Sequence, residues 1–99
     1  MSYRVRYTKG ARDDIRRLYS FLLDKDIEAA RRALDVIRKG VGFLRDFPFS
    51  CRTVAPNNPF LREFVIPFGS VGYVALFEID DQSQVTILAV RHQREDDYR

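Results

Sequence analysis

The sequence predicts a single α+β domain in which a hairpin of two helices packs on one face of a four-stranded, mostly antiparallel sheet. Three observations predict this fold. An alternating strand opens the chain, two stretches of helical periodicity follow, and three apolar strands with short connections come last. Two packed layers allow the apolar stripes of the helices and the sheet to cover each other. With 99 residues, we expect residues 1–99 to form one domain.

The first strand is expected over residues 3–8, where Tyr3, Val5 and Tyr7 alternate with polar residues. Thr8 then suits a helix N-cap, because its hydroxyl can accept a hydrogen bond from an unpaired N–H of the first turn. Helical spacing of apolar residues continues to about residue 23. The members of this stripe are Ala11, Ile15, Leu18, Tyr19 and Leu22.

A second helix is expected over residues 27–47, after a break at residues 24–26 in which Asp26 can act as the N-cap. Its apolar residues form two adjacent rows that span an arc of about 200°. So wide an arc predicts contact with both the first helix and the sheet. Pro48 should end the helix, because proline has no N–H to donate. The rows are Ile27, Ala30, Leu34, Ile37, Val41 and Leu44, and Ala29, Ala33, Val36, Gly40, Phe43 and Phe47.

Residues 49–59 are predicted to be a loop, and strands are expected at residues 60–68, 71–79 and 84–91. The connections between these strands are short enough for hairpins. In the last strand, Val85, Ile87 and Ala89 are expected on one face, and Leu88 and Val90 on the other. Since the strand at 71–79 is apolar on both faces, the face away from the helices needs a cover. The C-terminal tail, a second copy or a partner chain could provide it.

Composition excludes several classes of protein. No apolar run approaches the roughly 20 residues that span a bilayer, and residues 1–6 show no secretory signal, so we expect a cytoplasmic protein and no membrane partner. Cys51 is the only cysteine, which excludes an internal disulfide, and we expect a half-buried loop residue rather than a nucleophile. The sequence has no phosphate-binding glycine motif and no metal-ligand pattern. We therefore expect no cofactor and no metal.

The type of basic residue is more informative than the net charge. The net charge is +3, and fourteen of the seventeen basic residues are arginine. The planar donor fork of arginine suits an anionic partner, although a GC-rich genome would produce the same bias. Three arginines on the first helix, Arg12, Arg16 and Arg17, either pair with the acids of a partner or form a solvated helix face.

The ordered set of elements resembles the RelE/ParE toxin superfamily. The resemblance is carried by the opening strand and residues 11–15, by Leu61-Arg62-Glu63 before the strand that contains Tyr73, and by the ending at residues 85–96. It covers nearly the whole chain, although no single motif is stringent. It implies the toxin of a type II toxin–antitoxin pair, of the kind that stabilises plasmids, neutralised by a cognate antitoxin. One expected assembly is a toxin homodimer within a toxin–antitoxin heterotetramer.

The superfamily has two activities. RelE-like members cut messenger RNA on the ribosome, and ParE-like members poison DNA gyrase. Cutting RNA requires an acid, a base and cations that stabilise the phosphorane. In the regions that correspond to a RelE-like site, this chain offers Arg52 as a further cation, Glu63 or Glu95 as a base, and the candidate catalytic residues Arg62, Arg91, His92 and Tyr98.

Other features favour the gyrase branch. Residues 51–55 lack the lysine pair of RelE, and residues 95–97 are acidic and would repel a phosphate backbone. A simpler interpretation is that Arg91 pairs with Glu63 or Glu95 and that His92 caps the strand end. The sequence therefore favours a gyrase-binding toxin that is not itself an enzyme. The alternatives are a ribosome-dependent mRNA endonuclease, with the ribosome and mRNA as partners, and a non-toxic interaction module.

Overall fold

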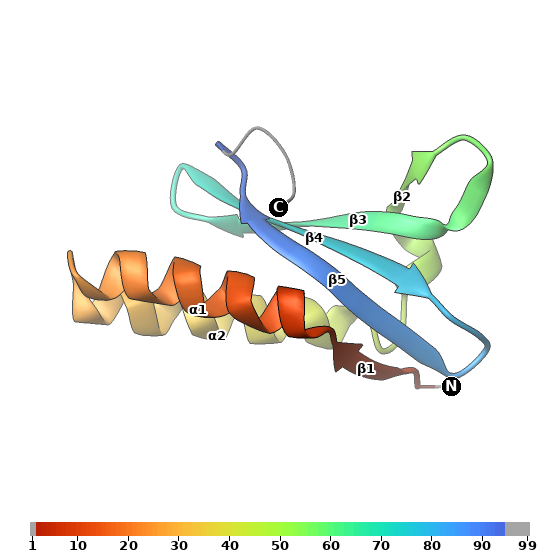
Figure 1. Cartoon of the computed structure of the whole chain (residues 1–99), viewed down its shortest axis with the longest axis horizontal. Coiled ribbons are helices and arrows are strands. Elements are labelled where there is room, and N and C mark those ends of the chain that lie inside the picture. The colour runs from red at the N-terminus through yellow and green to blue at the C-terminus, as the bar shows by residue number, and fades with distance from the viewer. Residues whose placement is uncertain (1, 95–99) are drawn as a thin grey trace.

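The computed structural model describes residues 2–94 and contains two helices packed on one face of a five-stranded mixed sheet (Figure 1). The sheet order is β1-β5-β4-β3-β2, with β1 parallel to β5 and the other pairings antiparallel. The α+β class and both helices agree with the prediction, whereas the number of strands does not. The elements are β1 (Arg4–Tyr7), α1 (Lys9–Leu23), α2 (Ile27–Phe43), the 3-10 helix η1 (Pro48–Ser50), β2 (Arg52–Ala55), β3 (Asn58–Phe68), β4 (Val71–Ile79) and β5 (Gln84–His92).

The additional strand is β2, which the sequence analysis placed in a loop. It pairs antiparallel with β3, with Arg52 opposite Glu63 and Thr53 opposite Arg62. Most of its residues are exposed, so no apolar alternation marks it in the sequence. The strand forms because the N–H and C=O groups along the edge of β3 are available for pairing. Pairing of this kind cannot be predicted from the alternation of residues within the strand itself.

The second helix ends at Phe43, four residues earlier than predicted. The N–H groups of Leu44, Arg45 and Asp46 donate to carbonyls three residues back, which tightens the chain into turns. Leu44 is fully buried, but Phe47 is 56% exposed. Phe47 packs on Phe43 from the turn that follows the helix, with ring centroids 5.3 Å apart. This apolar contact at helical spacing explains why the sequence predicted a longer helix.

Both predicted helix N-caps are present. The hydroxyl of Thr8 accepts a hydrogen bond from the N–H of Ala11 at 3.0 Å. The carboxylate of Asp26 accepts from the N–H groups of Glu28 and Ala29. Each bond satisfies a donor that the first helical turn leaves unpaired. The Asp26 cap begins α2 three residues after α1 ends, which allows the two helices to form a hairpin.

A β-bulge in β5 changes which of its residues face the helices. Leu76 of β4 lies opposite Ala89, whereas the next residue, Phe77, lies opposite Ile87, so Leu88 is the extra residue. The expectation that Val85, Ile87 and Ala89 share one face was therefore wrong. Beyond the bulge it is Val90 that joins the core beneath the helices, and Ala89 lies on the opposite face.

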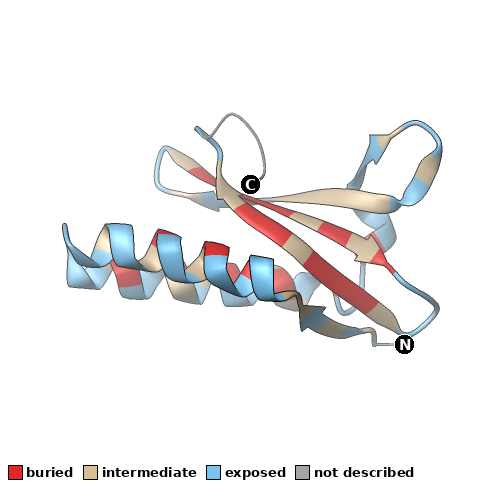
Figure 2. Ribbon diagram, viewed as in Figure 1, coloured by how far each residue is buried: buried red, intermediate tan, exposed pale blue. Residues whose placement is uncertain are grey.

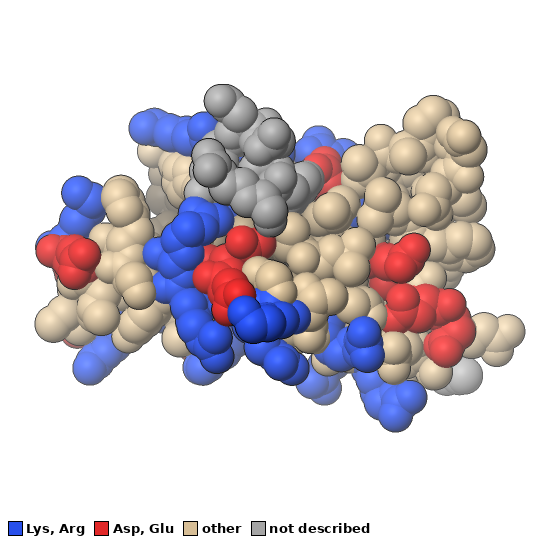
Figure 3. Space-filling model, viewed as in Figure 1, with Lys and Arg blue, Asp and Glu red and all other residues tan. Residues whose placement is uncertain are grey.

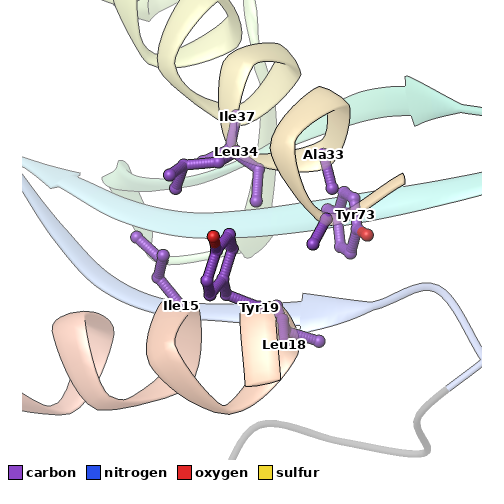
Figure 4. Close-up of a pocket in the computed structure, with 8 residues that line it drawn as sticks. Ile15, Leu18, Tyr19, Ala33, Leu34, Ile37 and Tyr73 are labelled. Carbon is purple, nitrogen blue, oxygen red and sulfur yellow. The ribbon is translucent and has the colours of Figure 1, made fainter. Parts of the chain in front are cut away.

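The core lies between the helix hairpin and β3, β4 and β5. Buried residues concentrate on the central strands and on the inner sides of the helices (Figure 2). A cavity of about 10 Å³ remains where Tyr19 of α1 and Leu34 of α2 face Tyr73 of β4 (Figure 4). Such a volume holds about one water molecule, so it is a packing defect and not a ligand site. Neither described helix is long and apolar enough to cross a membrane.

Candidate functional site

An open groove of about 780 Å³ runs beside the C-terminal half of α1. Residues of the β3–β4 hairpin and of the end of β5 line its opposite side. Figure 1 shows this hairpin next to the C-terminal half of α1. We call this feature the α1 groove. Its lining residues are Arg17, Leu18, Phe21, Leu22, Phe68, Gly69, Ser70, Val71, Tyr73, His92 and Arg94.

The walls of the α1 groove are apolar. Leu18 is buried beneath α1, whereas Phe21 points away from the core and is 62% exposed. On the opposite wall, the rings of Phe68 and Tyr73 lie 5.8 Å apart. Gly69 has a φ of +64°, a conformation that favours glycine, and it closes the tight β3–β4 turn that places Phe68 here. An exposed apolar surface of this kind is typical of a binding site.

The rim of the α1 groove is positively charged. Arg17 and Arg94 line it, and the ammonium of Lys25 lies 5.0 Å from the centroid of the Phe21 ring. None of its lining residues in the described part of the chain is acidic. Figure 3 shows Lys and Arg side chains gathered along α1. Arg17 also lies 3.7 Å from the carboxylate of Asp14. Apolar walls with a basic rim suit an amphipathic segment that carries acidic residues beside its apolar face.

Helix α1 positions the end of β5, which contributes His92 to the groove. The hydroxyl of Thr8 donates to the carbonyl of Leu88 at 3.1 Å, and the buried carboxylate of Asp14 accepts from the N–H of Val90 at 2.9 Å. Strand β1 ends at Tyr7, opposite Ile87, so no described strand covers this edge of β5 beyond Ile87, and the two side chains provide the missing backbone partners. In the register after the bulge, His92 lies on the helix face of the sheet, opposite Tyr73.

The structure does not bring Arg62 near His92. The Arg62 guanidinium donates to three carbonyl oxygens, those of Pro59 at 2.7 Å, Phe49 at 2.9 Å and Cys51 at 2.7 Å. It therefore holds η1 against the β2–β3 hairpin. Arg62 lies opposite Phe77, four residues along β4 from the partner of His92. Four residues correspond to about 13 Å along a strand.

Arg91 and His92 leave β5 on opposite faces of the sheet, because adjacent strand residues alternate. The imidazole Nδ1 of His92 accepts a hydrogen bond from the N–H of Arg94 at 3.2 Å, which closes the strand end as predicted. Glu63 pairs with Arg52 at 2.8 Å. Tyr98 and Glu95, the other predicted site residues, lie outside the described residues.

Cys51 lies where η1 meets β2 and is buried, with 9% of its surface exposed. Burial raises the pKa of its thiol, partly opposed by a hydrogen bond with Ser50 and by the charge of Arg62. A raised pKa keeps the sulfur protonated and poorly nucleophilic, which agrees with the structural role predicted for it. Within residues 2–94, no three His, Cys, Asp or Glu side chains gather in a way that could hold a metal ion.

The α1 groove was not predicted from the sequence, although one signal was present. Phe21 falls outside the apolar stripe of the first helix, on the side assigned to solvent, and a large apolar residue there indicates a contact surface. Phe68 and Val71 carried no such signal, because they lie at strand ends next to a turn. Only the packing of the hairpin beside α1 places them across from Phe21.

The fold and the groove define a small α+β protein with an exposed apolar groove beside its first helix. Residues 5–97 match the family described as the ParE toxin of the type II toxin-antitoxin system parDE. Toxin RelE1 of Caulobacter vibrioides is 30% identical over 79 residues, which cover 80% of this chain and 82% of that protein. The chain therefore belongs to the ParE toxin family, within the RelE/ParE superfamily, and the predicted resemblance is confirmed.

Two solved structures share the fold. The chromosomal ParDE toxin–antitoxin system of P. aeruginosa contains a chain that matches with a TM-score of 0.72 and 17% identity, covering 92% of this chain and 96% of that one. The toxin–antitoxin complex RelBE2 from Mycobacterium tuberculosis matches with a TM-score of 0.61 and 26% identity, covering 94% of this chain and all of the matched chain (100%).

Proposed function

We propose that this toxin inhibits growth by binding DNA gyrase in the cytoplasm and that it catalyses no reaction itself. The separation of the residues that a nuclease would need carries the proposal. Arg62 is bonded to three backbone carbonyls, while Arg91 and His92 point to opposite faces. An RNA-cutting site requires its acid, base and cations within hydrogen-bond reach of one phosphate. The arrangement of these side chains supports binding over cleavage.

We also propose that a cognate antitoxin neutralises the toxin by placing an acidic amphipathic helix in the α1 groove. Leu22, Phe68 and Val71 would receive apolar anchors spaced three or four residues apart on that helix. Its carboxylates would pair with Arg17 and Arg94 on the rim. The solved relatives are themselves parts of toxin–antitoxin systems, which supports a partner of this kind. In a heterotetramer with two toxin chains, each toxin chain would bind one antitoxin helix in its own α1 groove.

A pair of assays on purified components tests the choice of target. In the first, DNA gyrase supercoils relaxed plasmid with increasing amounts of the full-length toxin. In the second, translating ribosomes carry a labelled message, and wild type is compared with His92→Ala. We expect supercoiling to fall in proportion to the toxin and the message to remain intact.

The opposite result would assign the toxin to the nuclease branch. It would consist of full supercoiling at excess toxin together with codon-register cuts that disappear in His92→Ala. Loss of a working general acid or base lowers a rate by about 10²–10⁴-fold, so the effect would be unmistakable. Arg62, Arg91, His92 and Tyr98 would then be the catalytic candidates. Normal growth of cells that express the chain without antitoxin would instead favour a non-toxic interaction module.

A further inference from the structure

A second pocket, of about 260 Å³, lies at the end of the molecule where β4 turns into β5. Three aromatic rings line it, from Tyr3 ahead of β1, Phe49 of η1 and Phe60 of β3. Asp80 and Asp81 also line it. We call it the aromatic pocket. Figure 3 shows acidic side chains at this end of the molecule, beside a broad uncharged surface.

The rings of the aromatic pocket are held in place although they are partly exposed. Phe49 and Phe60 are 49% and 48% exposed, and they pack edge to face with centroids 6.3 Å apart. Arg62 fixes the segment that carries Phe49 by donating to its carbonyl, and its guanidinium lies 5.1 Å from the Phe49 ring. The backbone N–H of Tyr3 donates to the carbonyl of Arg45 at 2.7 Å. The pocket is therefore preorganised, which lowers the entropy cost of binding.

Hydrogen bonds also fix the two carboxylates. Asp80 accepts from the side chains of Gln84 and Thr86, and Asp81 accepts from the N–H and the hydroxyl of Ser83. Hydrogen bonds from Ser83 lower the pKa of Asp81, so this group stays negatively charged near neutral pH. A carboxylate has about four acceptor positions and can bind a further donor.

We propose that the aromatic pocket binds an arginine side chain presented by a protein partner. Aromatic faces attract cations. Nearby carboxylates neutralise the charge of a guanidinium and accept hydrogen bonds from its N–H groups. Arginine fits better than lysine because its planar head stacks on a ring while its edge donates to a carboxylate. The Arg62–Phe49 contact is an example of such stacking within the chain.

Two cations of the chain itself lie near the aromatic pocket. Arg4 interacts electrostatically with Asp81, and Arg62 occupies one side of Phe49. A guanidinium from the partner would contact Phe60 and Tyr3 and share the carboxylates with Arg4. The charges of Asp80 and Asp81 together balance those of Arg4 and Arg62, and the bonds of Arg62 to three carbonyls hold its guanidinium in place. The inference does not depend on whether the toxin acts on gyrase or on the ribosome.

Titration of the ¹⁵N-labelled full-length chain with the peptide acetyl-Gly-Arg-Gly-amide tests the proposal. We expect saturable shifts of the backbone amides of Phe60 and Asp81, with a dissociation constant in the millimolar range. The peptide with citrulline in place of arginine has the same shape and no charge. We expect it to bind about tenfold more weakly.

Variants separate the aromatic pocket from general charge attraction. Asp81→Asn and Phe60→Leu should each weaken binding of the arginine peptide, whereas the matched changes Asp35→Asn and Phe47→Leu, outside the pocket, should not. Equal binding of the citrulline peptide would overturn the proposal, as would equal losses in Asp35→Asn and Asp81→Asn. Absence of saturable shifts up to about 20 mM peptide would also overturn it. Should one pocket variant fail to fold, the other variant and the citrulline comparison on wild type give the answer.

Discussion

The carboxylate of Asp14 accepts a hydrogen bond from the backbone N–H of Val90 at 2.9 Å, and both residues are buried. This bond joins the first helix to the last strand at the bulge in β5. It gives the buried N–H of Val90 an acceptor that the neighbouring strands do not provide. The residues that follow then alternate so that Arg91 points to one face and His92 to the α1 groove. One buried carboxylate thus helps to set the direction of the chain end.

Removing the Asp14 carboxylate should destabilise the fold. We expect Asp14→Ala to lower the free energy of unfolding by about 1–3 kcal/mol, because it leaves the Val90 N–H buried without an acceptor. Asp14→Asn keeps an acceptor oxygen and should lose less. Urea unfolding measures both, with Asp13→Ala as the control, since Asp13 is exposed and pairs only with surface cations. Equal unfolding midpoints for Asp14→Ala and Asp13→Ala would refute the role of the bond.

Two glycine-to-alanine changes should have opposite effects. A Cβ on Gly72 would lie 2.2 Å from the carbonyl oxygen of Ile66, so Gly72→Ala forces the backbones of β3 and β4 apart. We expect a loss of about 1–3 kcal/mol in the free energy of unfolding. Gly42 of α2 has nothing within 4 Å of its Cβ position, and Gly42→Ala should stabilise the helix by roughly 0.5–1 kcal/mol. Thermal unfolding of both variants checks the pair, and a stable Gly72→Ala would show that the strands can separate at little cost.

The α1 groove can be tested against the antitoxin. Phe21→Ala should weaken antitoxin binding about tenfold or more, because a large apolar anchor is lost from the contact. Arg94→Glu should weaken it by placing an acid where we expect acids on the partner. Isothermal titration calorimetry provides the affinities. Phe47→Ala serves as the control, since Phe47 is similarly exposed but does not line the groove. Wild-type affinity in both Phe21→Ala and Arg94→Glu would place the antitoxin elsewhere.

The fold should lose stability in alkaline solution. Burial raises the pKa of the Tyr73 phenol above its ordinary value of 10.0, and it does the same for Tyr7 and for the Cys51 thiol. As the pH rises past these ordinary values, the unfolded chain releases protons that the folded chain retains, so the equilibrium shifts toward unfolding. We expect the thermal midpoint to fall between about pH 9 and pH 11. Tyr73→Phe removes one of these groups and should reduce the fall; an identical pH profile would argue against the burial effect.

The sequence by itself determined the local parts of the fold. Thr8 and Asp26 cap helices through bonds to residues two or three positions away, so their role is visible in the sequence. The strand at residues 71–79 was also predicted, but both of its faces are apolar, and only the structure shows that Tyr73, Ala75, Phe77 and Ile79 lie in the core beneath the helices. The order of these elements also indicated the toxin superfamily, which the comparisons confirm.

Only the tertiary structure decided the features that depend on pairing between distant segments. The strand β2 forms because β3 offers an edge, and the bulge at Leu88 reverses the faces of Ala89 and Val90. The bulge also decides which of the two neighbouring candidates, Arg91 or His92, lies on the helix face, since it shifts the alternation of every residue after Leu88. Periodicity describes each element alone, whereas the α1 groove and the aromatic pocket are made by side chains from elements that meet only when the sheet and the helix hairpin pack together.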